Sequence, residues 1–582
     1  MSDDTAIDTP HSDAVPARDE TTIVDRWLAA VLLGVGLLLR LLYIWHFRID
    51  SDEPQHLHVV WGWTQGMLPY RDFFDNHTPV FQALYAPLFH LLGVRADIVL
   101  PMRAGELPLY ALTIFCVWKI ARALYTPRIA LWTAVLAALW PSFYLNSIEF
   151  RPDQLWTLVW MLILLVLCTG VITPRRMWLV GLLCGLSFSV SMKTTLFLAA
   201  LLQALIGALL VRWAAGGLPL RWSHVARCLG AWLAGIIIIP ALVVLYFYLH
   251  GALKDMQYCV IQHNILPGTS TRALGNATIK MWLLGAVGAV IGGSMIARLR
   301  IPIPMRARIS FVFFAAFLYV TTLVAAWPVL TAEDYLPFFP AMALTAAPAL
   351  LWLTRLLTRS ANFPFGAVFA AAEMTAVLAT VSPFHDETAE KIGMVANTLK
   401  LTEPSDYVMD SKGETIYRRR PFYYVMESMT FHRMEKSLIP DTIAAELIAK
   451  RVPLATTHRM PHHTRAFNQN DARDFIKRNY LPIAFRLYVL GQRIRDDHAR
   501  ANLPIPFQVV VRQRYTLITP AGPPTGLLDG TPFDGPRELA IGGHTFVPDQ
   551  NADNVVLVWA PALERGFSPF AKIKADRRTE QD

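Results

Sequence analysis

The chain has 582 residues, of which 54% are hydrophobic and 17% are charged, and its mean hydropathy is +0.37. This composition excludes an ordinary soluble globular protein, because the apolar residues form long unbroken blocks instead of amphipathic repeats. The net charge of +9 does not indicate a nucleic-acid partner. Arginines that flank membrane spans give the same balance, and no DNA- or RNA-reading motif is present.

The N-terminal region predicts a membrane anchor. Residues 1–26 are polar and acidic and predict a disordered cytoplasmic tail. They lack a basic n-region, and no small-residue cleavage site follows the first apolar block, 27–47. That block is long enough to cross a bilayer, so we expect a retained signal anchor and not a removed signal peptide.

Apolar blocks continue along most of the chain and predict an α-helical polytopic membrane protein with about eleven transmembrane helices. The stretch 78–92 is apolar but shorter, and predicts a helix at the membrane interface. The expected spans are 27–47, 99–121, 129–147, 154–172, 177–192, 196–213, 229–249, 279–297, 309–330, 338–354 and 363–382.

Lysine and arginine cluster in alternate loops, as at 119–128, 175–176 and 298–308. The positive-inside rule makes these loops cytoplasmic, and the remaining loops are then exported. With an odd number of spans, the C-terminal portion is exported as well. The protein is therefore expected in a bacterial inner membrane, with its active site and C-terminus in the periplasm. The expected exported segments are 48–98, 148–153, 250–278, 331–337 and 383–582.

Residues 383–582 differ in character from the apolar part, 27–382, that forms the expected transmembrane catalytic domain. They are polar and proline-rich, and short strand-like runs such as 506–519 alternate with helix-like stretches. This pattern predicts a C-terminal mixed α/β domain with a β-rich end. Asp-Gly at 529–530 and Gly-Gly at 542–543 are expected turns in that end.

The first exported loop holds the strongest chemical signal. Asp52 and Glu53 stand where the first span ends, and charge at a membrane boundary is costly unless it is hydrated or used. His56, Arg71 and His77 follow among many aromatic residues. A carboxylate here can take the proton of an acceptor hydroxyl. A merely solvated polar loop is the alternative.

The same segment permits a metal site. Asp52 and His56 are four residues apart and Glu53 and His56 three apart, so they share one face of a helix and allow a divalent metal. A solvated helix face is the favoured alternative. No Walker, Rossmann or other nucleotide-binding glycine pattern occurs, so no nucleotide cofactor is expected.

Three further polar positions lie at the exported ends of spans. Asp153 follows Arg151 and Pro152 and either caps a helix or joins Asp52 across the bundle, with Arg151 near a phosphate. Lys193 lies between two short spans, where it snorkels or meets a buried anion. Tyr335 lies between two late spans, in a proline-rich segment.

In this order, these features resemble the polyprenyl-phosphate-dependent glycosyltransferases of the GT-C superfamily. The nearest branch is the family-39-like one, which includes protein O-mannosyltransferases and the aminoarabinose transferase of lipid A. The resemblance covers about 27–382. The features are Asp52-Glu53, His77-Thr78-Pro79 before an apolar helix, Arg151-Pro152-Asp153, and the DYLPFFP segment at 334–340.

The resemblance implies roles for the site residues. Asp52 is then the catalytic carboxylate, Glu53 is structural or metal-related, and Asp153 is the second acidic position. Tyr335 matches the tyrosine before the late proline motif. By this resemblance, His77 stands in the place of a lysine that contacts the donor phosphate in the aminoarabinose transferase. The cation is then supplied in its place by Lys193, Arg71 or Arg151.

The resemblance also implies a reaction. A sugar then passes from a polyprenyl-phosphate lipid donor to a hydroxyl of an envelope glycan, lipid or protein, by one inverting displacement. Two alternatives stay open. A transporter or flippase requires polar residues at mid-membrane, whereas the charges here gather at span ends. A lipid-linked glycan ligase or polymerase would use a large mid-chain exported loop, and 250–278 is poor in acidic residues.

Overall fold

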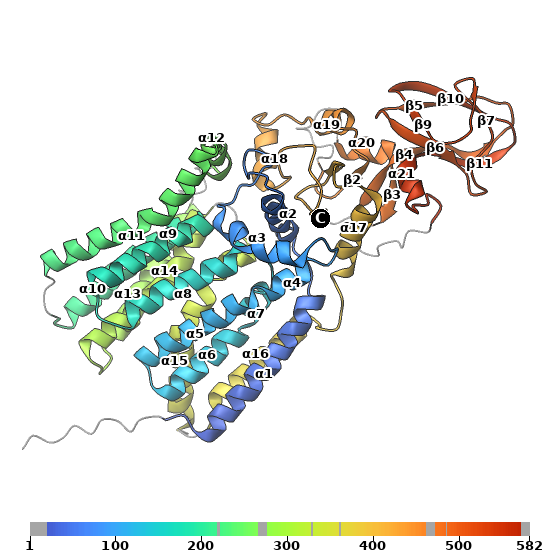
Figure 1. Cartoon of the computed structure of the whole chain (residues 1–582). Helices are drawn as coiled ribbons and strands as arrows, with labels where there is room; N and C mark the ends of the chain where they lie inside the picture. Colours follow the sequence, from blue (N-terminus) through green and yellow to red (C-terminus); the bar gives the residue numbers. More distant parts are fainter. Residues whose placement is uncertain are drawn as a thin grey trace, which may run out of the picture.

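The computed structural model describes most of the chain, and Figure 1 shows a bundle of long helices that carries a sheet-containing C-terminal part at one end. Residues 1–19 of the expected tail and 266–275 of the expected loop 250–278 lie outside the described residues. The described ranges are 20–217, 221–265, 276–327, 330–359, 363–460, 472–484 and 486–571.

Each of the eleven apolar blocks coincides with a helix of the bundle. Seven candidate spans are long and apolar enough to cross a membrane, so the chain is a multi-pass membrane protein. Helices α6, α8, α9 and α16 have only 13 to 17 residues, and the count of eleven spans stays a prediction. The bundle helices are α1 (Ile23–His46), α4 (Val99–Ala104), α5 (Leu107–Leu124), α6 (Pro127–Leu139), α8 (Pro152–Cys168), α9 (Pro174–Val190), α10 (Thr194–Ala214), α11 (Trp222–Leu249), α13 (Asn276–Ala297), α14 (Ile303–Ala326), α15 (Phe338–Thr358) and α16 (Phe365–Thr380).

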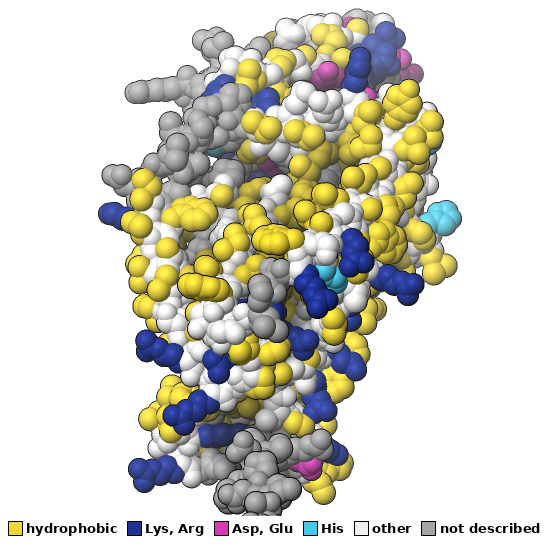
Figure 2. Space-filling view, turned by 90° about the vertical axis from the view of Figure 1, so that its left-hand side faces the viewer, with side chains coloured by type: hydrophobic (Ala, Val, Ile, Leu, Met, Phe, Trp, Pro, Cys, Tyr) yellow, Lys and Arg dark blue, Asp and Glu magenta, His cyan; other side chains and the backbone are white. Residues whose placement is uncertain are grey.

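The packing and surface of the bundle suit a lipid solvent. Glycines bring α9 and α11 into close contact: a Cβ at Gly181 would lie 2.1 Å from the carbonyl oxygen of Trp232, and one at Gly235 would lie 2.2 Å from that of Trp178. Small residues allow this approach between membrane helices. Figure 2 shows hydrophobic side chains over much of one face, with Lys and Arg gathered toward the lower half.

Polar loops gather at the two ends of the bundle according to the expected alternation. At one end, Asp25 at the start of α1 accepts a hydrogen bond from Trp132 and pairs with Arg128 at 2.9 Å. At the other end lie the loops 48–98, 148–153 and 331–337, which contact one another. The sequence therefore placed these three loops correctly on one common side.

A layer of short helices covers this second end, between the bundle and the C-terminal part (Figure 1). The expected interfacial helix at 78–92 is one of them. The layer consists of α2 (Asp52–Thr64), α3 (Val80–Leu92), α7 (Pro141–Asn146), a 3₁₀ turn (Ala332–Tyr335), α12 (Leu253–Gln257) and a π-helical turn (Tyr258–Gln262).

The C-terminal part contains two sheets. The first has the order β1-β2-β4-β11-β6-β9, with β3 also paired to β4, and the second has the order β5-β10-β7-β8. Only β1 and β2 pair in parallel among the described strands. The strands are β1 (Val408–Met409), β2 (Leu454–Thr456), β3 (Tyr480–Ala484), β4 (Leu487–Ala499), β5 (Ile505–Val509), β6 (Gln513–Ile518), β7 (Gly526–Leu528), β8 (Thr531–Pro532), β9 (Arg537–Leu539), β10 (Gly542–Pro548) and β11 (Ala552–Trp559).

Helices complete the C-terminal part, and two expectations about its strands need correction. The run 506–519 is not one strand, because β5 and β6 belong to different sheets. Gly542 and Gly543 do not form a turn but open β10 and pair with β5. The turn at 529–530 between β7 and β8 is confirmed, with positive φ at both residues. The helices are α17 (Ala389–Leu401), α18 (Ser428–Glu435), α19 (Ile443–Ala449), α20 (Ala472–Asn479) and α21 (Ala560–Glu564).

Candidate active site

Glu53 fixes the start of α2 against the bundle. Its carboxylate lies 2.6 and 2.7 Å from two guanidinium nitrogens of Arg103 and accepts hydrogen bonds from the backbone N–H groups of Asp50 and Phe150. Arg103 also donates to the carbonyl of Phe47, just after α1. Both charged side chains are fully buried. Since a buried charge is tolerated only when it is fully partnered, these contacts are those of a structural anchor.

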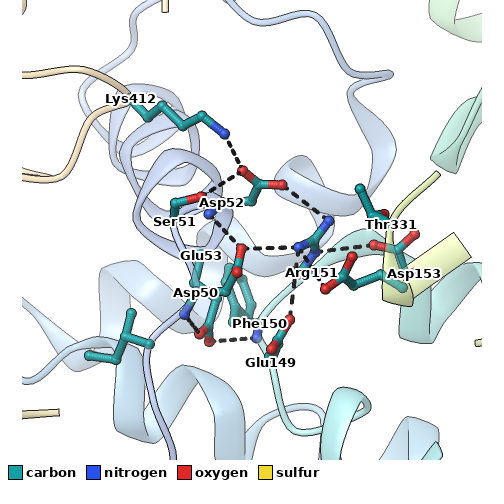
Figure 3. A network of polar contacts seen from close by, with 12 residues as sticks. Asp50, Ser51, Asp52, Glu53, Glu149, Phe150, Arg151, Asp153, Thr331 and Lys412 are labelled. Atoms are coloured by element: carbon teal, nitrogen blue, oxygen red, sulfur yellow. Dashed lines mark hydrogen bonds and ion pairs between the residues drawn. The ribbon is translucent and has the colours of Figure 1, made fainter. Parts of the chain in front are cut away.

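Asp52 is the first residue of α2 and lies between two cations (Figure 3). One carboxylate oxygen is 2.5 Å from Lys412 Nζ, and the other is 3.1 Å from the Arg151 guanidinium. Burial would raise the pKa of Asp52, but the two cations hold this pKa well below its usual range. About a quarter of the side chain, 24%, stays exposed, so a substrate can reach it.

Arg151 connects the carboxylates of three loops. It precedes Pro152 at the start of α8, and its side chain is only 10% exposed. Burial lowers the pKa of Arg151, but the surrounding carboxylates raise it well above its usual value, so the guanidinium stays charged. Its partners are Asp50 at 3.1 Å, Asp52 at 3.1 Å, Asp153 at 3.3 Å, Glu333 at 3.6 Å and Glu149 at 3.8 Å.

Lys193 lies at the break between α9 and α10 and meets buried anions, as one of the two expectations proposed. Its Nζ is 3.3 Å from Asp153 and 2.5 Å from Asp334. The other oxygen of the Asp334 carboxylate accepts hydrogen bonds from Thr331 and caps the 3₁₀ turn. Asp153 does join Asp52 across the bundle end, because Arg151 bridges the two carboxylates.

His77 lies beside the network without an ion pair to it. Its Nδ1 is 2.8 Å from Asp75, and Tyr70 donates a hydrogen bond to its carbonyl. Its ring lies 4.6 Å from that of His56, which in turn contacts Gln82. Burial holds the pKa of His56 well below its usual value, so its imidazole is neutral at physiological pH.

Two predicted donor-binding residues have weaker links to the network. Arg71 is half-exposed, pairs with Asp72 at 2.8 Å and donates to the carbonyl of His250. Arg71, Asp72 and His250 do not belong to the network around Asp52. Tyr335 is half-buried beside Asp334 and packs against the main apolar core. The structure therefore brings Arg151, Lys193 and Asp153 to Asp52 but leaves Arg71 apart.

The expected metal trio of Asp52, Glu53 and His56 is not favoured by the side-chain contacts, since each of the three is directed to a different partner. Another trio has carboxylate oxygens within 4.8 Å of one another. It consists of Asp50, Glu149 and Glu333.

A guanidinium already stands among this second trio. Arg151 Nη1 lies 3.1 Å from Asp50, 3.6 Å from Glu333 and 3.8 Å from Glu149, and Arg48 pairs with Glu149 at 3.0 Å. A hard divalent cation would take such oxygens as ligands, but it would have to displace Arg151. The residues present therefore do not fit a resident metal.

Four members of the network were not singled out from the sequence: Asp50, Glu149, Glu333 and Lys412. Asp50 accepts from the backbone N–H of Asp52 and pairs with Arg151, and its place beside the first span was a usable signal. Lys412 comes from a loop 360 residues after Asp52. A lysine in a polar tail carries no local signal of that contact.

The fold combines a helical bundle, a layer of short helices over one end, and a charged network beneath a C-terminal part. The ArnT protein of Cupriavidus metallidurans in its apo state shares this fold. The match has a TM-score of 0.52 and 14% identity and covers 75% of this chain and 93% of that one. ArnT bound to undecaprenyl phosphate gives a TM-score of 0.48 at 13% identity, covering 74% and 93% of the two chains.

A family model of the dolichyl-phosphate-mannose-protein mannosyltransferases matches residues 76–243, from the first loop to α11. A comparison with curated proteins finds no match. The oligosaccharyltransferase of Archaeoglobus fulgidus in its apo form is more distant, with 12% identity and a TM-score of 0.43 over 86% of this chain and 74% of that one. The chain thus shares the fold of ArnT, and its residues 76–243 match the mannosyltransferase family model.

Proposed function

We propose that the protein transfers a sugar from a polyprenyl-phosphate donor to a hydroxyl of an envelope glycan, lipid or protein. The reaction takes place at the periplasmic face of a bacterial inner membrane. The observation that carries the proposal is the partly exposed Asp52 carboxylate, held between two cations at the end of a membrane bundle. The match to a family described by a dolichyl-phosphate-linked sugar donor supports the choice of donor.

The position of the network suits a lipid-linked substrate. A polyprenyl chain stays in the hydrocarbon region, whereas its phosphate and sugar lie at the membrane surface. Asp52 follows α1 by six residues, and Asp153 and Lys193 lie at the same end of α8 and α10. This position at the ends of the spans supports the proposal that the groups meet the headgroup of a lipid-linked donor.

In the proposed reaction, the Asp52 carboxylate takes the proton of the acceptor hydroxyl. The hydroxyl oxygen then attacks the anomeric carbon, and the bond from this carbon to the phosphate oxygen breaks. The phosphate keeps the electron pair and leaves as polyprenyl phosphate. Because attack and departure occur on opposite faces, the anomeric configuration inverts. Cations near the phosphate stabilise the charge that develops on it.

Arg151 and Lys193 set the electrostatics of this site in different ways. Arg151 is surrounded by five carboxylates, so it orients Asp52 and balances the charge of the loops. Lys193 lies between Asp153 and Asp334. Both cations contribute positive potential at the phosphate. The N–H groups of both side chains already pair with carboxylates of the protein.

The protein in nanodiscs, incubated with undecaprenyl-phosphate-linked sugars, tests the proposal. Sugar release to water or to envelope extract is followed by thin-layer chromatography of radiolabelled donor. We expect Asp52→Asn to lower the rate at least 1,000-fold, because an amide cannot accept the proton. The matched control is Asp97→Asn in the same loop, whose carboxylate pairs with Arg95 at the surface.

Mass spectrometry of envelope glycans from a strain that lacks the protein identifies the sugar and the acceptor. Loss of one glycan modification, restored by the wild-type gene but not by the Asp52→Asn gene, is the expected result. Equal turnover by the Asp52→Asn and wild-type proteins would remove Asp52 from its role. Absence of transfer with every polyprenyl-phosphate sugar would contradict the choice of donor.

A further inference from the structure

Lys412 enters the network from the C-terminal part of the chain. Its side chain is 7% exposed, and its Nζ lies 2.5 Å from Asp52 Oδ1. Among the described residues, Asp52 is its one hydrogen-bond or ion-pair partner. Figure 3 shows the lysine reaching Asp52 from the side opposite Arg151.

Hydrogen bonds within the loop hold the segment that carries Lys412. The Asp410 carboxylate accepts hydrogen bonds from the backbone N–H groups of Gly413 and Thr415 at 2.7 and 2.8 Å, and from the Thr415 hydroxyl at 2.7 Å. Arg420 pairs with the same carboxylate at 3.2 Å. These contacts fold residues 410–415 around Asp410 and project Lys412 outward.

The same loop is docked on the first loop of the bundle. His58, on α2, contacts the carbonyl of Ile416 through its Nδ1 at 2.8 Å, and Tyr417 donates to the carbonyl of Arg95 at 2.9 Å. Gly413 has a φ of +83° and lies so close to His58 that an added Cβ would be 2.6 Å from the histidine Cβ. The position of Lys412 relative to Asp52 is therefore fixed from both sides.

The cations of the network differ in the number of groups that each one pairs with. Arg103 is held by Glu53 and by backbone carbonyls, Arg151 by five carboxylates and Lys193 by two. Lys412 has a single carboxylate partner and three ammonium protons to donate. An arriving phosphate competes most easily for this cation.

We propose that Lys412 binds the donor phosphate and that, in doing so, it releases Asp52 to act as the general base. This inference rests on the proposed function. The ammonium group stays protonated and moves its hydrogen bond from the Asp52 carboxylate to a non-bridging phosphate oxygen. Asp52 then takes the proton of the acceptor hydroxyl, and the departing polyprenyl phosphate keeps its contact with Lys412. The C-terminal part thus supplies a group that the apolar domain lacks.

Such an exchange makes the basicity of Asp52 depend on whether the donor phosphate is bound. The charged and titratable groups around Asp52 are Lys412, Arg151, His56 and Asp50. Arg151 keeps its place when the donor binds, whereas Lys412 turns to the phosphate. Loss of one close cation makes the carboxylate more basic. The base therefore becomes effective when the donor is present, and Lys412 shields it otherwise.

Binding of undecaprenyl phosphate tests the first half of the proposal. The protein is placed in nanodiscs of phosphatidylethanolamine and phosphatidylglycerol, and its affinity is measured by microscale thermophoresis. We expect Lys412→Met to weaken binding at least tenfold and Lys412→Arg, which keeps the charge, to stay within threefold of wild type. Lys400→Met, at an exposed lysine of α17, is the control and is expected to bind like wild type.

The pH dependence of kcat/KM tests the second half, because its acid limb reports the base of the free enzyme. Removal of Lys412 raises the pKa of Asp52, so the acid limb of Lys412→Met moves to higher pH. A merely structural lysine would lower the amount of folded protein without moving this limb.

The outcomes separate the two claims. If wild-type protein does not bind undecaprenyl phosphate, the proposed function fails, and the role of Lys412 fails with it. If the wild-type protein binds and Lys412→Met binds equally well with an unchanged acid limb, only the role of Lys412 is overturned. Midpoint temperatures of thermal unfolding are measured for each variant. If Lys412→Met is unfolded, the affinity of Lys412→Arg for undecaprenyl phosphate decides the question. Tenfold weaker binding by Lys412→Arg then contradicts the proposal.

Discussion

The Glu53 carboxylate accepts four hydrogen bonds, two from Arg103 and two from the backbone of neighbouring loops. Asp52, the preceding residue, has two cationic partners and keeps part of its surface exposed. The two adjacent acidic residues thus have different environments. Glu53 is fully buried and fully hydrogen-bonded, whereas Asp52 is partly exposed to solvent. This difference suits Glu53 to an anchoring role and Asp52 to its proposed role as the general base.

Substitution of the anchor should mainly affect stability. Glu53→Gln removes the charge that balances the buried Arg103, and breaking a buried ion pair costs about 3–5 kcal/mol. We expect a lower midpoint of thermal unfolding, measured by tryptophan fluorescence in detergent. The control is Glu538→Gln, which removes an exposed partner of Arg512 and should cost less than about 1 kcal/mol. An unchanged midpoint for Glu53→Gln would contradict the anchoring role.

The position of Arg151 leads to a prediction about metal dependence. Its guanidinium occupies the space among Asp50, Glu149 and Glu333, where a divalent cation would bind. Treatment with EDTA should therefore leave sugar transfer within twofold of its initial rate. Loss of activity on chelation, with recovery after addition of Mg²⁺ or Mn²⁺, would show that a metal displaces Arg151.

Several site residues could be predicted because their positions have local causes. Asp52, Arg151, Asp153 and Lys193 are charges at the ends of apolar blocks, and such charges are rare unless they are used or paired. Arg71 carried a similar signal within the first loop, yet it pairs at the surface. Which charge turns inward depends on the packing of α2, which the sequence pattern does not specify.

At the level of elements, the docking of the 410–420 loop on α2 determines whether Lys412 reaches Asp52. Gly413→Ala places a methyl group against His58 and strains a residue with φ of +83°. We expect kcat/KM to fall at least tenfold, because the loop moves and Lys412 moves with it. Steady-state kinetics with a polyprenyl-phosphate sugar measures this effect.

The matched control is Gly393→Ala in α17, where an added Cβ has no atom within 4 Å. Alanine is preferred in helices, so this variant should be as active as wild type and slightly more stable. Full activity of Gly413→Ala, with a normal midpoint of unfolding, would show that the loop need not hold this position.

The helices of the bundle were predictable because a span needs a long apolar block, and each block coincides with a helix. The strands were less predictable from the sequence than the helices. The residues 506–519 read as one strand, but β5 and β6 pair with different partners, in different sheets. Gly542 and Gly543 have the composition of a turn, yet β10 needs them to pair with β5. Strand partners far along the chain decide both cases.

At the scale of the whole molecule, the site is assembled from both parts of the chain. The layer of short helices supplies Asp52, the loops at the end of the bundle supply Arg151 and Lys193, and the C-terminal part supplies Lys412. The sequence pattern indicated each part separately. It could not indicate their contact, because the contact depends on tertiary docking across 360 residues.

This assembly requires the C-terminal part to lie on the same side of the membrane as the end of α1. If the positive-inside rule applies, that side is the periplasm. Intact spheroplasts carrying Asp534→Cys should react with a membrane-impermeant maleimide, since Asp534 is largely exposed in the C-terminal part. The five native cysteines are all buried, so background labelling should be low.

A cysteine at the opposite end of the bundle provides the comparison. Arg298→Cys, in the basic segment between α13 and α14, should react only after the membrane is permeabilised. That paired result would place Asp52, Lys412 and the C-terminal sheets outside the cytosol, on the side that the proposed reaction requires. Labelling of Arg298→Cys and protection of Asp534→Cys in intact spheroplasts would reverse the orientation and place the network in the cytosol. The periplasmic reaction would then be untenable.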